Sequence, residues 1–117
     1  MPTEPEILTL SKAARRAVDV VDPEDTNDAV ASFEERFVDR DEPVTAFEHP
    51  DELFAEEAGR IDPDDPALQM TAAVAAYLSY RRDEVDQPPE ELLRRAAAAE
   101  YDGSPPPEIQ QWLSGRV

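Results

Sequence analysis

The 117-residue sequence predicts an all-α fold, a compact bundle of five or six short helices around a central apolar helix. The 12 Pro residues lie at the edges of long Pro-free stretches, so they separate helices rather than break them. No stretch alternates apolar and polar residues as a half-buried strand does, and the chain has only 3 Gly for hairpin turns. At this length we expect residues 1–117 to form a single helical domain.

Residues 4–21 form the first predicted helix. Thr3 and Glu6 have the spacing of a capping box, and small apolar residues recur along one face of the segment. The sequence leaves an alternative open, in which residues 6–10 are extended and Ser11 is the N-cap of a shorter helix.

The second and third predicted helices span residues 27–40 and 50–58. Asp25 or Thr26 is the expected N-cap of the second, which carries apolar residues at helical spacing. The third begins at a proline, which suits a first helical turn, and we expect Gly59 to be its C-cap.

Residues 67–84 form the strongest predicted helix, because Asp65 is a good N-cap and Pro66 suits the first helical position. The segment is apolar on nearly all sides, which predicts a central helix that its neighbours cover. Two further helices are predicted over residues 88–101 and 108–113.

The chain carries 28 Asp plus Glu against 11 Lys plus Arg, which gives a formal net charge of -17. Nucleic-acid affinity depends largely on cationic side chains that displace counterions, so we expect no nucleic-acid partner. Ten of the basic residues are Arg, and Ala and Val dominate the apolar residues. Carboxylates stay hydrated in concentrated salt, and small side chains avoid over-strong burial there. The composition therefore resembles that of cytoplasmic proteins of salt-in halophilic archaea, with GC-rich coding as the alternative explanation.

No apolar run approaches the roughly 18 residues of a membrane span, and the first residues lack the basic start and apolar core of a secretory signal. We therefore expect a cytoplasmic protein with no membrane partner. With no Cys and one His, His49, the sequence predicts no catalytic, cofactor-binding or metal-ligating residue. Two acidic loops, residues 22–25 and 62–65, leave weak, unspecific association with potassium or magnesium open.

Three Arg pairs depart from the acidic character of the chain: Arg15-Arg16, Arg81-Arg82 and Arg94-Arg95. Glu90 and Glu91 stand four residues before the last pair, and we expect ion pairs between them. Asp19 is the expected partner of Arg15. The functional alternative is an interface, because Arg and aromatic residues are enriched in protein recognition. The candidate interface residues are Arg15, Arg81, Arg82, Tyr77, Tyr80 and Trp112.

These observations favour a noncatalytic protein-interaction module: an adaptor, a regulator or a small subunit of an assembly. Its expected partner is another protein or a second copy of the chain in a homodimer. One alternative is an acidic inhibitor that mimics nucleic acid. Another is a small-ligand binder or an enzyme that uses carboxylates and Tyr.

Overall fold

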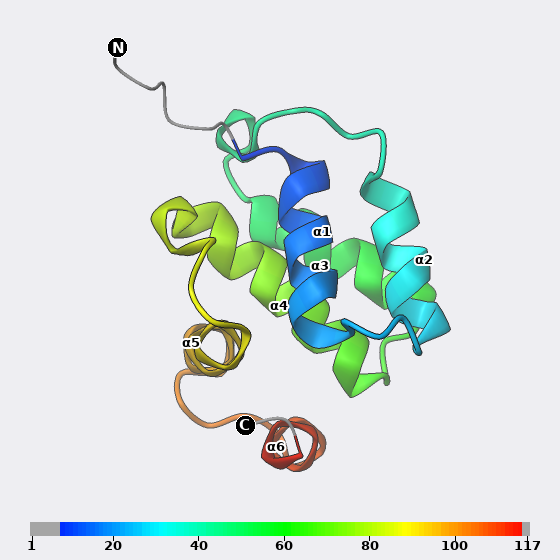
Figure 1. Ribbon diagram of the computed structural model, residues 1–117, viewed down its shortest axis with the longest axis vertical. Helices are drawn as coiled ribbons and strands as arrows, with labels where there is room; N and C mark the ends of the chain where they lie inside the picture. Colours follow the sequence, from blue (N-terminus) through cyan, green and yellow to red (C-terminus); the bar gives the residue numbers. More distant parts are fainter. Residues whose placement is uncertain (1–7, 116–117) are drawn as a thin grey trace.

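The computed structural model describes residues 8–115, which form six α-helices and no β-strand (Figure 1). In chain order the helices are α1 (Leu10–Val21), α2 (Asp28–Phe37), α3 (Pro50–Ile61), α4 (Pro66–Tyr80), α5 (Pro89–Tyr101) and α6 (Pro107–Ser114). Two short 3-10 turns, η1 (Val44–Ala46) and η2 (Arg82–Glu84), lie in the connections. The predicted all-α class is confirmed. No helix in this part of the chain is long and apolar enough to cross a membrane.

Helix α4 is the centre of the fold, and α1, α3 and α5 pack around it (Figure 1). Of its 15 residues, 11 are buried, and five of these are Ala. The two buried hydroxyl residues are satisfied inside the helix, because Thr71 and Ser79 donate to backbone carbonyls one turn earlier, at 2.8 and 2.9 Å. The prediction of a central apolar helix is therefore confirmed.

The largest side chains of the core lie between α2 and α3. Phe33 and Phe37 of α2 meet Phe54 of α3, with ring centroids 5.0 to 6.1 Å apart and all three rings tilted to one another. All three side chains are fully buried. Tilted rings at these distances have favourable electrostatics, so this cluster stabilises the α2–α3 contact beyond its buried area.

Helix α1 begins at Leu10, and its N-cap is Thr9, whose hydroxyl accepts a hydrogen bond from the backbone nitrogen of Lys12 at 3.2 Å. The start at residue 4 is wrong. The alternative of a shorter helix is correct in placing extended backbone before it, at Thr9, but wrong in making Ser11 the cap. The backbone nitrogen of Leu10 donates to the Glu42 carbonyl at 3.0 Å. Thr9, directly before it, has an extended backbone and forms an isolated antiparallel bridge with Pro43. The capping box of Thr3 and Glu6 lies outside the described residues.

Helix α2 begins after Asn27, whose side chain accepts a hydrogen bond from the backbone nitrogen of Val30 at 3.1 Å. The prediction of Asp25 or Thr26 as the cap is therefore wrong. The helix also ends earlier than predicted, at Phe37. Helix α3 runs past Gly59 to Ile61, so the glycine is an interior residue rather than a C-cap.

Helix α4 has the predicted cap, since the Asp65 carboxylate accepts a hydrogen bond from the backbone nitrogen of Ala67 at 3.0 Å. It ends at Tyr80, four residues before the predicted end, because the backbone of Arg81 leaves the helical region at φ -128° and ψ 62°. The chain then turns through η2 into α5. This connection, residues 81–88, forms one side of the candidate site described next.

Candidate functional site

A groove of about 360 Å³ lies between α1 and the α4–α5 connection, and four of the chain's 11 basic residues line it. The cationic residues are Lys12, Arg15, Arg16 and Arg82; the others are Leu8, Asp19, Val85 and Asp86. We call this feature the basic groove. It concentrates positive charge in a chain whose formal net charge is -17.

Helical spacing places the α1 residues of the groove on one face. Lys12, Arg15 and Asp19 follow one another at three and four residues, which is one side of an α-helix. The opposite side of α1 carries the buried alanines Ala13 and Ala17, which pack into the core. Packing of the small residues against the core therefore directs the charged residues towards the groove.

Arg16 fastens the far wall of the groove to α1. Its Nε donates to the Val85 carbonyl and its Nη2 donates to the Gln87 carbonyl, each at 3.0 Å. Both acceptors belong to the α4–α5 connection, far away in the sequence. One planar guanidinium thus fixes the position of this connection against α1.

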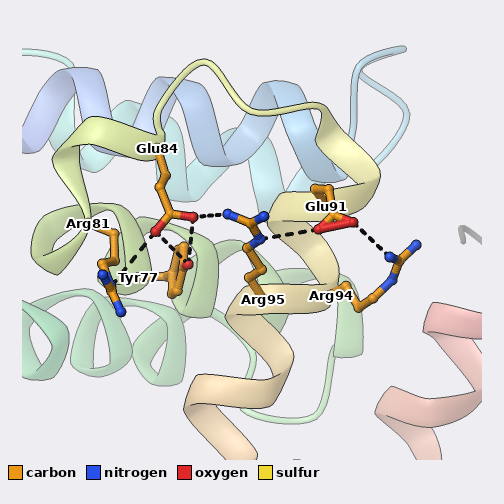
Figure 2. A network of polar contacts seen from close by, with 6 residues as sticks. All are labelled: Tyr77, Arg81, Glu84, Glu91, Arg94 and Arg95. Atoms are coloured by element: carbon orange, nitrogen blue, oxygen red, sulfur yellow. Dashed lines mark hydrogen bonds and ion pairs between the residues drawn. The ribbon is translucent and has the colours of Figure 1, made fainter.

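Glu84 holds the same connection from its other side, as Figure 2 shows. The Tyr77 hydroxyl donates to both oxygens of its carboxylate at 3.0 and 2.9 Å, and the Arg95 guanidinium donates to Oε1. Arg81 Nε lies 3.8 Å from Oε2 (Figure 2). The Glu84 side chain is only 12% exposed. Side chains of both α4 and α5 therefore hold η2 in place through Glu84.

The electrostatics of Glu84 favour its charged form. Desolvation raises the pKa of this carboxyl, but the hydrogen bonds from Tyr77 and Arg95 outweigh it and bring the pKa below its ordinary value. The pKa of the Tyr77 phenol is raised, because burial and the neighbouring Glu84 carboxylate both disfavour its ionised form. Glu84 therefore stays ionised at neutral pH.

Arg94 and Arg95 are paired within the chain, as the sequence predicts, although the acceptors differ in part. Glu91 bonds Arg94 Nη1 at 2.8 Å and Arg95 Nε at 3.2 Å (Figure 2). Glu91, rather than the expected Glu90, is the acceptor for Arg94, and Glu84 supplies an additional acceptor for Arg95. Sequence spacing could not reveal this partner, since η2 reaches α5 only in the folded chain.

Arg15 and Arg82 have donor groups that the fold leaves available. Arg82 uses Nη1 to donate to the Ser79 carbonyl at 3.0 Å. Arg15 has no hydrogen bond and no ion pair to any residue within 8–115, so its expected pairing with Asp19 is not formed. The basic groove thus holds guanidinium groups that a ligand can reach.

The six predicted interface residues fall into three places. Arg15 and Arg82 line the basic groove, and Trp112 of α6 is half-buried against the core. Tyr77, Tyr80 and Arg81 line a second groove of about 290 Å³ between α3, α4 and α5. The sequence missed Lys12, Arg16 and Val85. Helical spacing to Arg15 could have indicated Lys12, and Arg16 belongs to an Arg pair that stands out in the sequence, but Val85 had no sequence signal.

The second groove is lined by four alanines and by two acidic side chains, Asp51 and Glu100. Tyr80 is 54% exposed, and its hydroxyl donates to Asp51 at 2.6 Å. This hydrogen bond, together with desolvation, raises the pKa of Tyr80 to about 12. Desolvation and the charge of Asp51 raise the pKa of Glu100, which faces the same groove. These acids make the second groove opposite in sign to the basic groove.

Residues 8–115 contain no group of three or more His, Asp or Glu side chains placed to hold a metal ion. His49 lies exposed before α3 and makes no capping hydrogen bond with its side chain. Comparison with protein-family models, with curated proteins and with solved structures finds no match to this chain.

Proposed function

We propose that the chain is a noncatalytic protein-interaction module that binds a partner protein through the basic groove. The observation that carries this proposal is Arg15, which lines a concave surface and pairs with no other residue in 8–115. Acidic side chains are abundant in this chain, so a guanidinium left without one is available for recognition.

The charge distribution supports a protein partner over nucleic acid. The net charge of -17 repels a phosphate backbone, and Asp19 and Asp86 stand on the walls of the groove itself. A folded protein partner needs only local complementarity, which guanidinium groups beside apolar side chains supply.

The test is affinity capture with the full chain in the cell that makes it, at high salt, followed by mass spectrometry. We expect a stable partner with the wild-type chain and its loss when Arg15→Glu and Arg82→Glu are combined. The matched control combines Arg60→Glu and Arg94→Glu, which changes the net charge equally at exposed positions away from the groove. Equal recovery of the partner by both double variants would contradict the proposal.

A further inference from the structure

The basic groove also has features that define the chemistry of its occupant. We propose that it binds a peptide segment in which one carboxylate side chain stands beside an aliphatic one. This inference rests on the proposed function and specifies the kind of partner segment that the groove fits.

The carboxylate is indicated by the two guanidinium groups. Arg15 has all its donors available among the described residues, and Arg82 has Nε and Nη2 left after its bond to the Ser79 carbonyl. A guanidinium presents parallel N–H groups that match the two oxygens of a carboxylate. Arg15 and Arg82 come from α1 and η2, so each of the two walls of the groove presents a guanidinium to an acid.

The number of charges that fit is limited by the acids on the walls. Asp19 and Asp86 line the same groove, and Arg16 already donates from Nε and Nη2 to two backbone carbonyls. A long run of negative charge would therefore meet repulsion, whereas an isolated carboxylate would not. This balance favours a segment with a single acid at the groove over a polyanion.

The aliphatic neighbour is indicated by Leu8 and Val85, which supply the apolar part of the lining. A volume of about 360 Å³ suits a few side chains rather than a whole helix. The wall that carries Val85 is held by Arg16 on one side and by Glu84 on the other. A wall fixed before binding lowers the ordering cost of association.

Salt should weaken this contact little. At 1 M salt the Debye length is about 3 Å, so long-range attraction is lost while guanidinium–carboxylate pairs in direct contact are retained. Concentrated salt also strengthens apolar burial. We therefore expect the peptide to bind in molar potassium chloride.

The probe is the synthetic peptide acetyl-Ser-Gly-Glu-Leu-Gly-Ser-amide, titrated into the isotope-labelled full chain and followed by NMR in molar potassium chloride. We expect shifts at the Arg15 and Arg82 side chains. Arg15→Gln and Arg82→Gln should each weaken binding about two- to fivefold, because each removes an exposed ion pair with the carboxylate. Arg15→Lys should also weaken it, since an ammonium lacks the paired donors. Arg94→Gln is the matched control and should leave the affinity unchanged.

Changes to the peptide separate the two recognition elements. Gln in place of Glu, or Ala in place of Leu, should each weaken binding. Equal binding of either changed peptide, or equal loss with Arg94→Gln, would overturn the inference. So would potassium acetate or inorganic phosphate binding the groove as tightly as the peptide. Self-association of the chain that Arg15→Gln abolishes would assign the groove to a second copy instead.

Two readouts keep this inference separate from the proposed function. Circular dichroism and thermal melting verify that every variant is folded. If affinity capture depends on Arg15 and Arg82 but the peptide does not bind, the interaction module stands and this description of its partner fails. If the peptide binds but no captured partner depends on the groove, the proposed function fails instead.

Discussion

Asp22 organises the turn between α1 and α2, and removing its carboxylate should destabilise the fold. The residue is only 6% exposed. Its Oδ1 accepts hydrogen bonds from the Thr26 backbone nitrogen and hydroxyl, both at 3.0 Å, and its Oδ2 accepts one from the Asn27 backbone nitrogen at 2.9 Å. Because Asn27 is the N-cap of α2, the same carboxylate fixes the start of the next helix.

The magnitude follows from these contacts. A hydrogen bond to a charged group contributes about 1.5–3 kcal/mol net. Thr26 is exposed, so its donors can turn to water when the carboxylate is removed. We therefore expect Asp22→Ala to lower the free energy of unfolding by about 2–4 kcal/mol. Asp22→Asn keeps Oδ1 but places a donor against the Asn27 nitrogen, so it should cost about 1–2 kcal/mol.

Urea denaturation in molar potassium chloride, followed by far-ultraviolet circular dichroism, measures these differences. Glu24→Ala is the matched control, since it removes an exposed carboxylate from the same turn and should change stability by less than about 0.5 kcal/mol. The reasoning is refuted if Asp22→Ala is no more destabilising than Glu24→Ala, because relief of charge repulsion would then outweigh the lost hydrogen bonds.

Three further predictions concern the solvent, the aromatic core and the acids. Helicity and the thermal midpoint should rise steeply with potassium chloride, because salt screens repulsion among 28 acidic side chains; unchanged circular dichroism from dilute buffer to molar salt would refute this. Phe54→Ala should cost about 3–5 kcal/mol in urea denaturation, with Phe54→Leu milder because it leaves a smaller cavity. In an NMR titration Glu84 should titrate below pH 4.5 and Glu100 above it. Glu84 thus contributes stability that is fully present above its unfolded pKa and is lost as the pH falls through its lowered folded pKa. Asp51→Asn should lower the pKa of Glu100 towards its ordinary value, and the part of the shift that desolvation causes should remain.

Local chemistry explains why several helices were predictable. Asp65 and Pro66 start α4 with a side-chain acceptor and a fixed φ, and both effects act within a few residues. The left-handed backbone of Gly103, at φ 82°, similarly marks the turn after α5. The apolar surface of α4 on all sides is also a property of its own sequence, and it predicted the central position.

Other boundaries depended on distant residues. The start of α1 combines a local cap, Thr9, with a hydrogen bond from the Leu10 backbone nitrogen to the Glu42 carbonyl, and no local pattern indicates that second contact. Gly59, a residue type that often ends a helix, lies inside α3, which continues to Ile61, and Ile61 packs against the core. At Gly59 the helix continues despite a local cost of about 1 kcal/mol for glycine inside a helix.

The sequence by itself determined the helical class, the central helix and the presence of Arg pairs that stand out from an acidic chain. Only the tertiary structure decided that Arg15 of α1 and Arg82 of η2 line the same groove, while Arg81 faces a different one. The physical reason is that α4 ends at Tyr80, and the chain after it is held in place by Arg16 on one side and by the contacts of Glu84 on the other. Those contacts join residues far apart in the sequence, so their geometry exists only in the folded chain.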